Sequence, residues 1–371
     1  MARDRLLERF ERLCATRSPT GEERAVADAV TRELRELGCE VTEDEAAGPA
    51  HAGAGNLIAR RPGSGDGFVM FCAHLDTVPH ADEIEVELAD GVYRSRGDTI
   101  LGADNKAAVA VLIELAAAHA KKDAGVGLEL VLTVAEETGL RGAKELDTSA
   151  LRSEFGFVLD HSSPMGEVII AAPTYKRMVA EFEGIAAHSG IRPEAGRSAI
   201  SAAASAIAGM QLGRLDDETS ANVGVIHGGF ATNIVASECR IEAEARSLDH
   251  ARAAETMGEM VDACTWAAGE HGCDVDLEVT ELFRAYRLPK GSAPAALARD
   301  ALARCGYEAS DVVTGGGSDA NALIAAGFDC ALLANGTSDN HTPNEAVAAD
   351  SITGMLRVCE TLLTLTAERS A

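Results

Sequence analysis

The sequence predicts a mixed α/β fold into which a smaller α+β domain is inserted. Short apolar runs alternate with longer helical patterns, which is typical of buried strands connected by helices. The apolar runs span residues 67–73, 128–135, 155–159 and 328–334. A different pattern interrupts this alternation between Lys176 and Phe283, with the order strand, helix, strand, strand, helix, strand. That order indicates a ferredoxin-like split βαβ unit.

These patterns divide the chain into two domains. We expect a discontinuous α/β domain from residues 1–174 and 285–371, because a helical pattern over residues 293–305 resumes the alternation after the insertion. The inserted domain then covers residues 175–284. Its strands are expected at 176–184, 222–227, 239–247 and 275–282, and its helices at 197–212 and 250–269.

The first part of the chain predicts helices over residues 5–14 and 22–37 and strands over residues 39–43 and 56–60. Between the two helices, Ser18–Glu23 has the pattern of a helix cap. The segments 86–88 and 92–95 are expected to form a hairpin. Residues 104–122 are the strongest helical pattern, with Asp104 in the first turn and two lysines in the last.

Composition narrows the possible partners. The 371-residue chain has a formal net charge of −26, which argues against nucleic acid or an anionic membrane as a partner. The sequence has no uncharged apolar run of about 18 residues, so no membrane span is expected. The nine cysteines form no CxxC pair, and the amphipathic start of the chain is unlike a signal peptide. We therefore expect reduced thiols and a cytoplasmic protein.

Metal-binding side chains follow each of the four apolar runs. They are His74 and Asp76 after the first, Glu136 and Glu137 after the second, Asp160 after the third, and His341 beyond the fourth. Ligands of open α/β sheets gather outside the carboxyl ends of the strands. Asp104, at the start of the long helix, belongs to the same set. Two imidazoles and several carboxylates suit two Zn²⁺ ions about 3.5–4 Å apart.

The adjacent acids Glu136 and Glu137 are expected to divide their roles. Their side chains diverge at the end of a strand, so one can bind metal while the other faces a water molecule. A carboxylate within hydrogen-bond reach of that water is suited to act as general base. Asp76 is the acid left over when each metal has its ligands, and it is expected to hold the His74 ring from behind.

These motifs resemble those of the co-catalytic zinc peptidase and aminoacylase family, which includes peptidase T, carboxypeptidase G, succinyl-diaminopimelate desuccinylase and aminoacylase. The segments are HLDTV at 74–78, GADNKA at 102–107, EETG at 136–139, Asp160, and NHTPNE at 340–345. In the inserted domain, AAHSGIRPEAG at 186–196 and GGFATN at 228–233 resemble the family's lid motifs. Asp160, where carboxypeptidase-type members carry Glu, points to the peptidase-T-like branch.

The resemblance implies a role for each site residue. His74, Asp104 and Asp160 would bind one metal, and Asp104, Glu137 and His341 the other, with Asp104 bridging. Asp76 would orient His74, and Glu136 would be the general base. The implied substrate contacts are His188, Asn233, Arg246 and the backbone around Gly317 and Ser318. Arg246 could instead form an ion pair with neighbouring acids, and the glycine-rich segment is also a strand-to-helix turn.

The resemblance further implies two Zn²⁺ ions per subunit, replaceable by Mn²⁺ or Co²⁺, and a homodimer formed through the inserted lid domain. The expected reaction is hydrolysis of an amide bond in a small peptide, as in an aminopeptidase or tripeptidase. An aminoacylase-type enzyme acting on N-acyl amino acids remains an alternative. A non-catalytic metal-binding dimer is the third possibility, but such a relative would be expected to have lost Glu136 or a ligand.

Overall fold

The chain forms two compact units, each described separately below. The structure is a computed structural model that describes residues 2–122 and 124–370. The first unit comprises residues 1–170, 288–314 and 318–371, and the second comprises residues 171–287 and 315–317. The short segment 315–317 thus joins the second unit, unlike the expected division. The reason is local packing, since Arg246 donates to the carbonyl of Gly315 and the Phe283 ring leaves no room for a side chain at Gly317.

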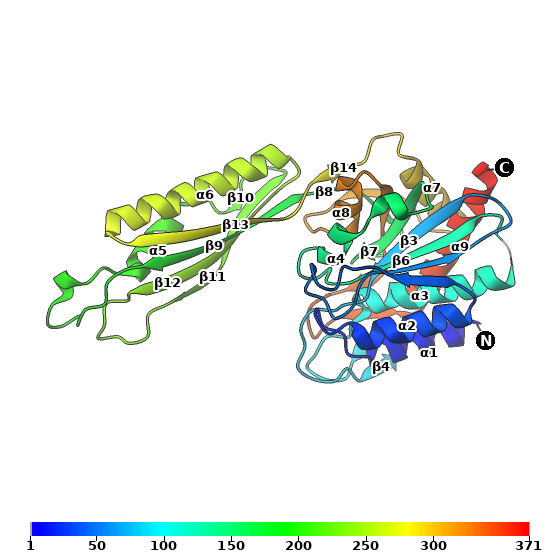
Figure 1. Ribbon diagram of the computed structural model, residues 1–371, viewed down its shortest axis with the longest axis horizontal. Helices are drawn as coiled ribbons and strands as arrows, with labels where there is room; N and C mark the ends of the chain where they lie inside the picture. The colour runs from blue at the N-terminus through cyan, green and yellow to red at the C-terminus, as the bar shows by residue number, and fades with distance from the viewer. Residues whose placement is uncertain (1, 123, 371) are drawn as a thin grey trace. The chain divides into compact units, whose positions relative to one another are not determined.

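A mixed sheet forms the centre of the first unit (Figure 1). Its strands follow the order β1-β2-β6-β3-β7-β16-β8-β14, and β15 pairs with β8. The two-residue strand β14 and the last two residues of β8 are the ends of the range 171–287, where the chain passes between the units. The neighbours β6, β3, β7 and β16 are parallel, so their carboxyl ends share one edge of the sheet. The strands are β1 (Glu40–Glu43), β2 (Leu57–Arg61), β3 (Phe68–His74), β6 (Gly127–Thr133), β7 (Phe155–His161), β8 (Glu167–Ala172), β14 (Tyr286–Arg287), β15 (Ser310–Val313) and β16 (Asp329–Ala334).

Helices cover both faces of this sheet (Figure 1). Side chains alternate along β3, so Phe71 joins the core that contains α3, while Cys72 faces Asp319 at the start of α8. The helices are α1 (Ala2–Cys14), α2 (Arg24–Glu36), α3 (Ala103–Lys121), α4 (Arg141–Glu145), α7 (Ala293–Arg304), α8 (Asp319–Ala325) and α9 (Ala349–Ser370). A second sheet has the order β17 (Thr337–Ser338), β18 (Ala346–Ala348), β5 (Val92–Ser95) and β4 (Val86–Ala89).

One local expectation near the N-terminus was wrong. The side chains of Ser18–Glu23 do not cap α2, because Glu23 holds the N-cap position but makes no side-chain capping bond. Ser18 is instead fully buried, and its backbone pairs with Thr77. Asp104 lies in the first turn of α3, as expected, and Gly102 holds the N-cap position with a φ of 71°. Asp104 itself departs from helical geometry, with a φ of −82° and a ψ of 103°.

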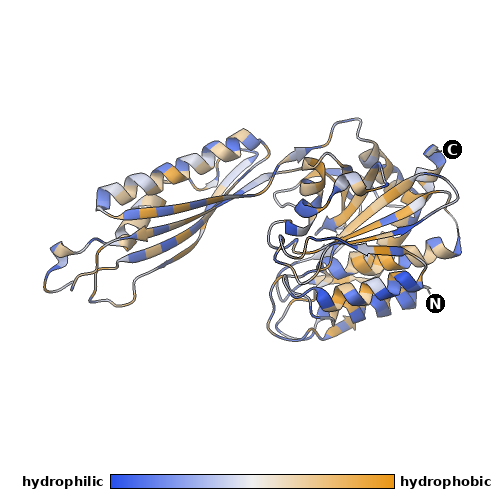
Figure 2. Ribbon diagram, viewed as in Figure 1, coloured by the Kyte–Doolittle hydropathy of each residue, from blue (hydrophilic) through white to orange (hydrophobic). Residues whose placement is uncertain are grey.

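The second unit has the expected β-α-β-β-α-β order, with one short strand, β10, added before β11. Its antiparallel sheet follows the order β10-β11-β12-β9-β13, and the helices α5 and α6 pack on one face. Figure 2 shows hydrophobic and hydrophilic residues alternating along these strands, as one covered face requires. The elements are β9 (Thr174–Glu183), α5 (Ala199–Gly209), β10 (Gly213–Arg214), β11 (Thr219–Gly228), β12 (Glu238–Ser247), α6 (His250–His271) and β13 (Asp274–Phe283).

Membrane-spanning helices are absent from the part of the chain that the structure describes, because no helix there combines sufficient length with sufficient apolar character.

A buried ionic network joins the helices of the first unit. Glu114 on α3 is 2% exposed and accepts hydrogen bonds from Arg5 and Arg9 on α1. Arg9, which is 3% exposed, also donates to Glu33 on α2 at 2.7 Å. Although burial acts in the opposite direction, the hydrogen bonds from the two arginines lower the pKa of Glu114. The network therefore fixes α1 and α2 against the central helix.

We predict that Glu114→Gln lowers the free energy of unfolding by about 3 kcal/mol at neutral pH, because it leaves the buried Arg9 charge poorly compensated. The folded pKa of Glu114 lies below its unfolded value, so its contribution exists above the unfolded pKa and is lost as the pH falls through the folded pKa. Urea unfolding at pH 7 and pH 4 measures both effects. Glu8→Gln, at an exposed position of α1, is the control. Equal effects of the two substitutions would contradict the prediction.

Candidate metal centre

The shared edge of the four parallel strands brings the predicted ligands together. His74 is the last residue of β3, Asp160 lies near the end of β7, and Glu136 and Glu137 follow β6. The Nε2 atom of His74 lies 3.4 Å from Oδ1 of Asp160. Parallel pairing aligns these strand ends, so the sheet itself determines that the side chains meet.

Asp104 lies between the two imidazoles. Its Oδ1 atom is 3.3 Å from Nε2 of His74, and its Oδ2 atom is 3.2 Å from Nε2 of His341. The same His341 nitrogen is 3.1 Å from Oε2 of Glu137. Each oxygen of one carboxylate therefore faces a different histidine, which is the arrangement that a carboxylate bridging two metal ions requires.

Asp104 is itself held by a buried acid that the sequence prediction did not assign. Glu345 accepts hydrogen bonds from the backbone N–H groups of Leu101, Gly102 and Asp104 at 2.8–2.9 Å. Burial nevertheless raises the pKa of Glu345 to about 7. The NHTPNE segment thus supplies both His341 and the residue that fixes the backbone at Asp104.

Asp76 fixes the two adjacent glutamates as well as lying beside His74. Its Oδ1 accepts from the N–H of Glu136 at 3.0 Å, and its Oδ2 from the N–H of Glu137 at 3.3 Å. Nδ1 of His74 is 2.9 Å from the Asp76 carbonyl oxygen and 3.5 Å from its carboxylate. The His74 ring is therefore oriented chiefly by the backbone of Asp76, while the carboxylate orients the Glu136–Glu137 peptide.

The electrostatics of this edge are dominated by crowded, buried acids. Burial, with the charges of Asp104 and Asp319, raises the pKa of Asp160 to about 8. Burial and the charge of Asp160 raise the pKa of Glu136 well above its ordinary value. Hydrogen bonds to Asp104 and Glu137 raise the pKa of His341 to about 10. In the metal-free protein, protons bound to these side chains therefore balance the negative charge of the carboxylates.

The side chains fit divalent metal ions. His74, Asp104 and Glu137 offer ligand atoms that all lie within 4.8 Å of one another, and so do His74, Glu136 and Asp160. Within the described residues, the Oε1 atom of Glu137 is buried and has no hydrogen-bond partner. A buried carboxylate oxygen without a donor is costly unless a cation lies beside it. Imidazole and carboxylate together are ligands typical of zinc.

In the second unit, the loops of His188 and Asn233 lie side by side. The N–H of Ser189 donates to the carbonyl of Asn233 at 3.0 Å, and His188 forms a β-bridge with Ile234. His188 is exposed, and its Nδ1 accepts from the N–H of Gly190 at 3.2 Å. A neutral imidazole whose Nδ1 accepts a hydrogen bond carries its proton on Nε2, so Nε2–H is left as a donor.

The other expected substrate contacts are occupied within the chain. Arg246 lies 4.0 Å above the Tyr175 ring and pairs with Glu244, which is the alternative the sequence left open. Gly317 packs against Phe283 with no space for a Cβ atom. Ser318 is fully buried, its N–H donates to Asn321, and its hydroxyl caps α8. Binding of substrate by Arg246, Gly317 and Ser318 stays a prediction, and the Ser318 N–H is already used.

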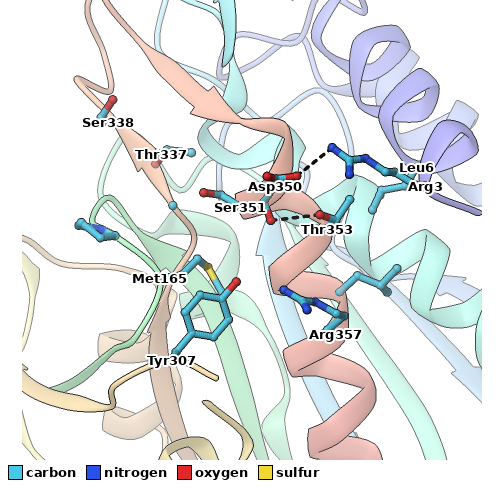
Figure 3. Close-up of a pocket in the computed structure, with 13 residues that line it drawn as sticks. Arg3, Leu6, Met165, Tyr307, Thr337, Ser338, Asp350, Ser351, Thr353 and Arg357 are labelled. Carbon is cyan, nitrogen blue, oxygen red and sulfur yellow. Dashed lines mark hydrogen bonds and ion pairs between the residues drawn. The ribbon is translucent and has the colours of Figure 1, made fainter. Parts of the chain in front are cut away.

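A separate hollow of about 880 Å³ lies elsewhere on the first unit (Figure 3). Tyr307, Thr337, Ser351 and Arg357 are among the residues that line it, and an Arg3–Asp350 ion pair crosses its rim. None of the predicted metal ligands is among the residues that line this hollow. The hollow is therefore distinct from the cluster of histidines and acids.

Several buried or half-buried polar residues at the centre escaped prediction because their partners are distant in the sequence. They are Thr20, Lys106, Asp319 and Glu345. Asp319, which is 1% exposed, accepts a hydrogen bond from Thr133 on β6. The signal available in the sequence was the position of Lys106 and Glu345 inside the GADNKA and NHTPNE segments, directly beside predicted ligands.

Comparisons with known proteins agree with this geometry. A family model described as "Peptidase dimerisation domain" matches residues 170–272, and one described as "Peptidase family M28" matches residues 56–172. The Bacillus subtilis protein YqjE is 36% identical over 350 residues, covering 94% of each chain.

Two solved structures are similar over nearly their whole length. Aminopeptidase PepT from Bacillus cereus is 36% identical, with a TM-score of 0.86 and 98% of each chain covered. A tripeptidase from Staphylococcus aureus is 34% identical, with a TM-score of 0.92 and 99% of each chain covered. The expected fold class, a mixed sheet flanked by helices with an inserted α+β domain, is confirmed.

We predict that bound Zn²⁺ stabilises the first unit, because removal of the metal leaves several buried carboxylates facing one another. The stabilisation should reach about 2.7 kcal/mol when free metal is 100 times its dissociation constant. Thermal unfolding with and without chelator measures it, and Asp104→Asn should abolish most of the difference. A melting temperature that ignores both zinc and chelator would refute a metal centre here.

Proposed function

This chain belongs to the family of co-catalytic zinc peptidases and aminoacylases, in its peptidase-T-like branch, and we propose that it cleaves small peptides with two metal ions and Glu136 as general base. The observation that carries the proposal is Asp104, whose two oxygens face His74 and His341 at 3.3 and 3.2 Å. The chain is accordingly a metallopeptidase, and the number and identity of its ions are part of the proposal.

His74, Asp104 and Asp160 would hold one ion, and Asp104, Glu137 and His341 the other. Zn²⁺ is the proposed metal, because imidazole and carboxylate form the ligand set, and Mn²⁺ or Co²⁺ could substitute for it. Divalent ions held there would polarise the scissile carbonyl and make water a better nucleophile at neutral pH. Burial, together with repulsion from Asp104, raises the pKa values of Glu137 and Asp160, and the cations would offset that repulsion.

Glu136 is the residue that we propose moves the proton. It is 9% exposed and its backbone is fixed by Asp76, so its carboxylate has a limited range of positions. As general base it would accept a proton from the attacking water and then donate that proton to the departing amine nitrogen. Glu137, whose Oε2 lies beside His341, would remain a ligand throughout.

His188 is proposed to stabilise the oxyanion that develops on the scissile carbonyl oxygen. The hydrogen bond from Gly190 to its Nδ1 supports this role, because it leaves Nε2–H as a donor that needs no reorganisation. Asn233, in the neighbouring loop, would bind the same part of the substrate. Arg246 would bind a substrate carboxylate only after exchanging its contact with Glu244.

The same comparisons support a proposal for the substrate class and the assembly. The two similar structures are described as an aminopeptidase and a tripeptidase, which supports a short peptide with a free amino end as the substrate. The match to a dimerisation domain at residues 170–272 suggests a dimer, and we propose a homodimer formed through the second unit. A cytoplasmic location stays a prediction from the sequence.

We predict that Glu136→Gln retains both metal ions and loses on the order of 10²- to 10⁴-fold in kcat, as expected for loss of a general base. Glu137→Gln should instead weaken metal binding. Elemental analysis and hydrolysis of a panel of di- and tripeptides and N-acyl amino acids measure both. Near-normal turnover by fully loaded Glu136→Gln would show that the base is another residue, and preference for N-acyl amino acids would favour an aminoacylase.

We predict that His188→Ala lowers kcat by roughly 10²-fold or more and changes KM less, because the lost hydrogen bond forms chiefly in the transition state. Mixing this variant with Glu136→Gln separates the two possible arrangements. If His188 serves the partner subunit, the mixed dimer regains one intact site and part of the activity. If it serves its own subunit, no activity returns. Full activity of His188→Ala alone would exclude a catalytic role.

A further inference from the structure

A strap from the N-terminal region, with Ser18 and Pro19 buried and Thr20 half-buried, runs beside the segment that carries Asp76. The N–H of Thr77 donates to the carbonyl of Ser18 at 3.0 Å, and the N–H of Thr20 donates to the carbonyl of Thr77 at 3.1 Å. Pro19 and Thr77 form a parallel β-bridge. Residues 18–20 therefore continue the backbone pairing beyond the end of β3. They belong to the segment that connects α1 to α2.

A buried lysine, Lys106, donates a hydrogen bond to the strap. Ser18 is fully buried, and its hydroxyl donates to the carbonyl of Leu75 at 3.0 Å while it accepts a hydrogen bond from Nζ of Lys106. Lys106 is 1% exposed and lies on α3. A buried ammonium group is costly unless it is hydrogen-bonded, so its contact with Ser18 restricts where the strap can lie.

Thr20 joins this strap directly to the Asp76 carboxylate. Its hydroxyl donates to Oδ2 of Asp76 at 2.7 Å, the shortest contact of that carboxylate. The same oxygen accepts from the N–H of Glu137, and the other oxygen accepts from the N–H of Glu136. The Thr20 hydroxyl thus fixes the Asp76 carboxylate, which in turn fixes the backbone of Glu136 and Glu137.

The backbone at those glutamates depends on such support. Ala135, immediately before Glu136, has a φ of 50°, a conformation that residues with a Cβ atom rarely adopt. Positions of this kind persist only where surrounding contacts hold them. The N–H bonds of Glu136 and Glu137 to Asp76 are contacts of that kind, and they would weaken if the carboxylate could rotate.

We infer that Thr20 is a positioning residue, which fixes the Asp76 carboxylate and through it the placement of Glu136 and Glu137 at the metal centre. The predicted effect of Thr20 on turnover rests on the proposed function. Its predicted effect on zinc affinity requires only that the metal centre exists. The Thr20 hydroxyl touches neither a metal ligand nor the proposed base, so its influence passes through Asp76.

Thr20→Val keeps the shape of the side chain and removes the hydroxyl. We expect kcat at saturating zinc to fall about 10- to 100-fold with little change in KM, and zinc affinity to weaken within the same range, as for other groups that support metal ligands. Thr20→Ser should restore both values. Thr16→Val is the matched control, because Thr16 is half-buried like Thr20 and follows the end of α1, where its hydroxyl donates to the carbonyl of Arg12, away from Asp76.

The measurements are peptide hydrolysis against substrate concentration and zinc titration of the metal-free protein by calorimetry. Wild-type kcat and zinc affinity in Thr20→Val would overturn the inference, as would equal losses in Thr20→Ser and Thr20→Val. If Thr20→Val does not fold, Thr20→Ala removes the same hydroxyl with a smaller side chain. If the wild-type protein hydrolyses no peptide, the proposed function fails, while the zinc titration still decides whether Thr20 supports the metal centre.

Discussion

Compensation of buried negative charge at one sheet edge is the constraint on which this protein depends. Parallel pairing of β6, β3 and β7 places Glu136, Glu137, His74 and Asp160 at the same end of the sheet. Carboxylates so close together and so buried cannot all be ionised without cations beside them. The raised pKa of Asp160, about 8, and of His341, about 10, both express this demand. Two divalent ions would satisfy it while creating a reactive centre.

The surrounding fold serves to hold these groups in place rather than to separate them. Glu345 binds the backbone that presents Asp104, and Asp76 binds the backbone that presents Glu136 and Glu137. Both carboxylates accept hydrogen bonds from backbone N–H groups. They therefore orient the ligand-bearing backbone and would not compete with the ligands for metal ions. Further out, Thr20 fixes Asp76, and the Glu114 network fixes α3 against α1. Residues farther from the metal centre therefore contribute by fixing the positions of the residues closer to it.

The sequence predicted the parts of this arrangement that depend on short-range pattern. Apolar runs followed by His or acidic residues are visible in one dimension, and parallel strands must end at a common edge, so the order of residues alone brings His74, Glu137 and Asp160 together. The cap predicted for Ser18–Glu23 was wrong because the local pattern suits a helix start, whereas the long-range pairing of Ser18 with Thr77 decides the conformation. Lys106 and Glu345 were missed for the same reason, since their partners lie far away in the chain. Whether Arg246 pairs with Glu244 or with a substrate carboxylate could not be decided from spacing, because an arginine suits either kind of carboxylate; in the structure it pairs with Glu244.

The account stands on two metal ions sharing Asp104, and anomalous X-ray diffraction from crystals of the zinc-loaded protein tests it most directly. We predict two zinc peaks in each subunit, one beside His74 and Asp160 and the other beside Glu137 and His341, with the Asp104 carboxylate between them. A single peak, or zinc bound away from Asp104, would contradict the account.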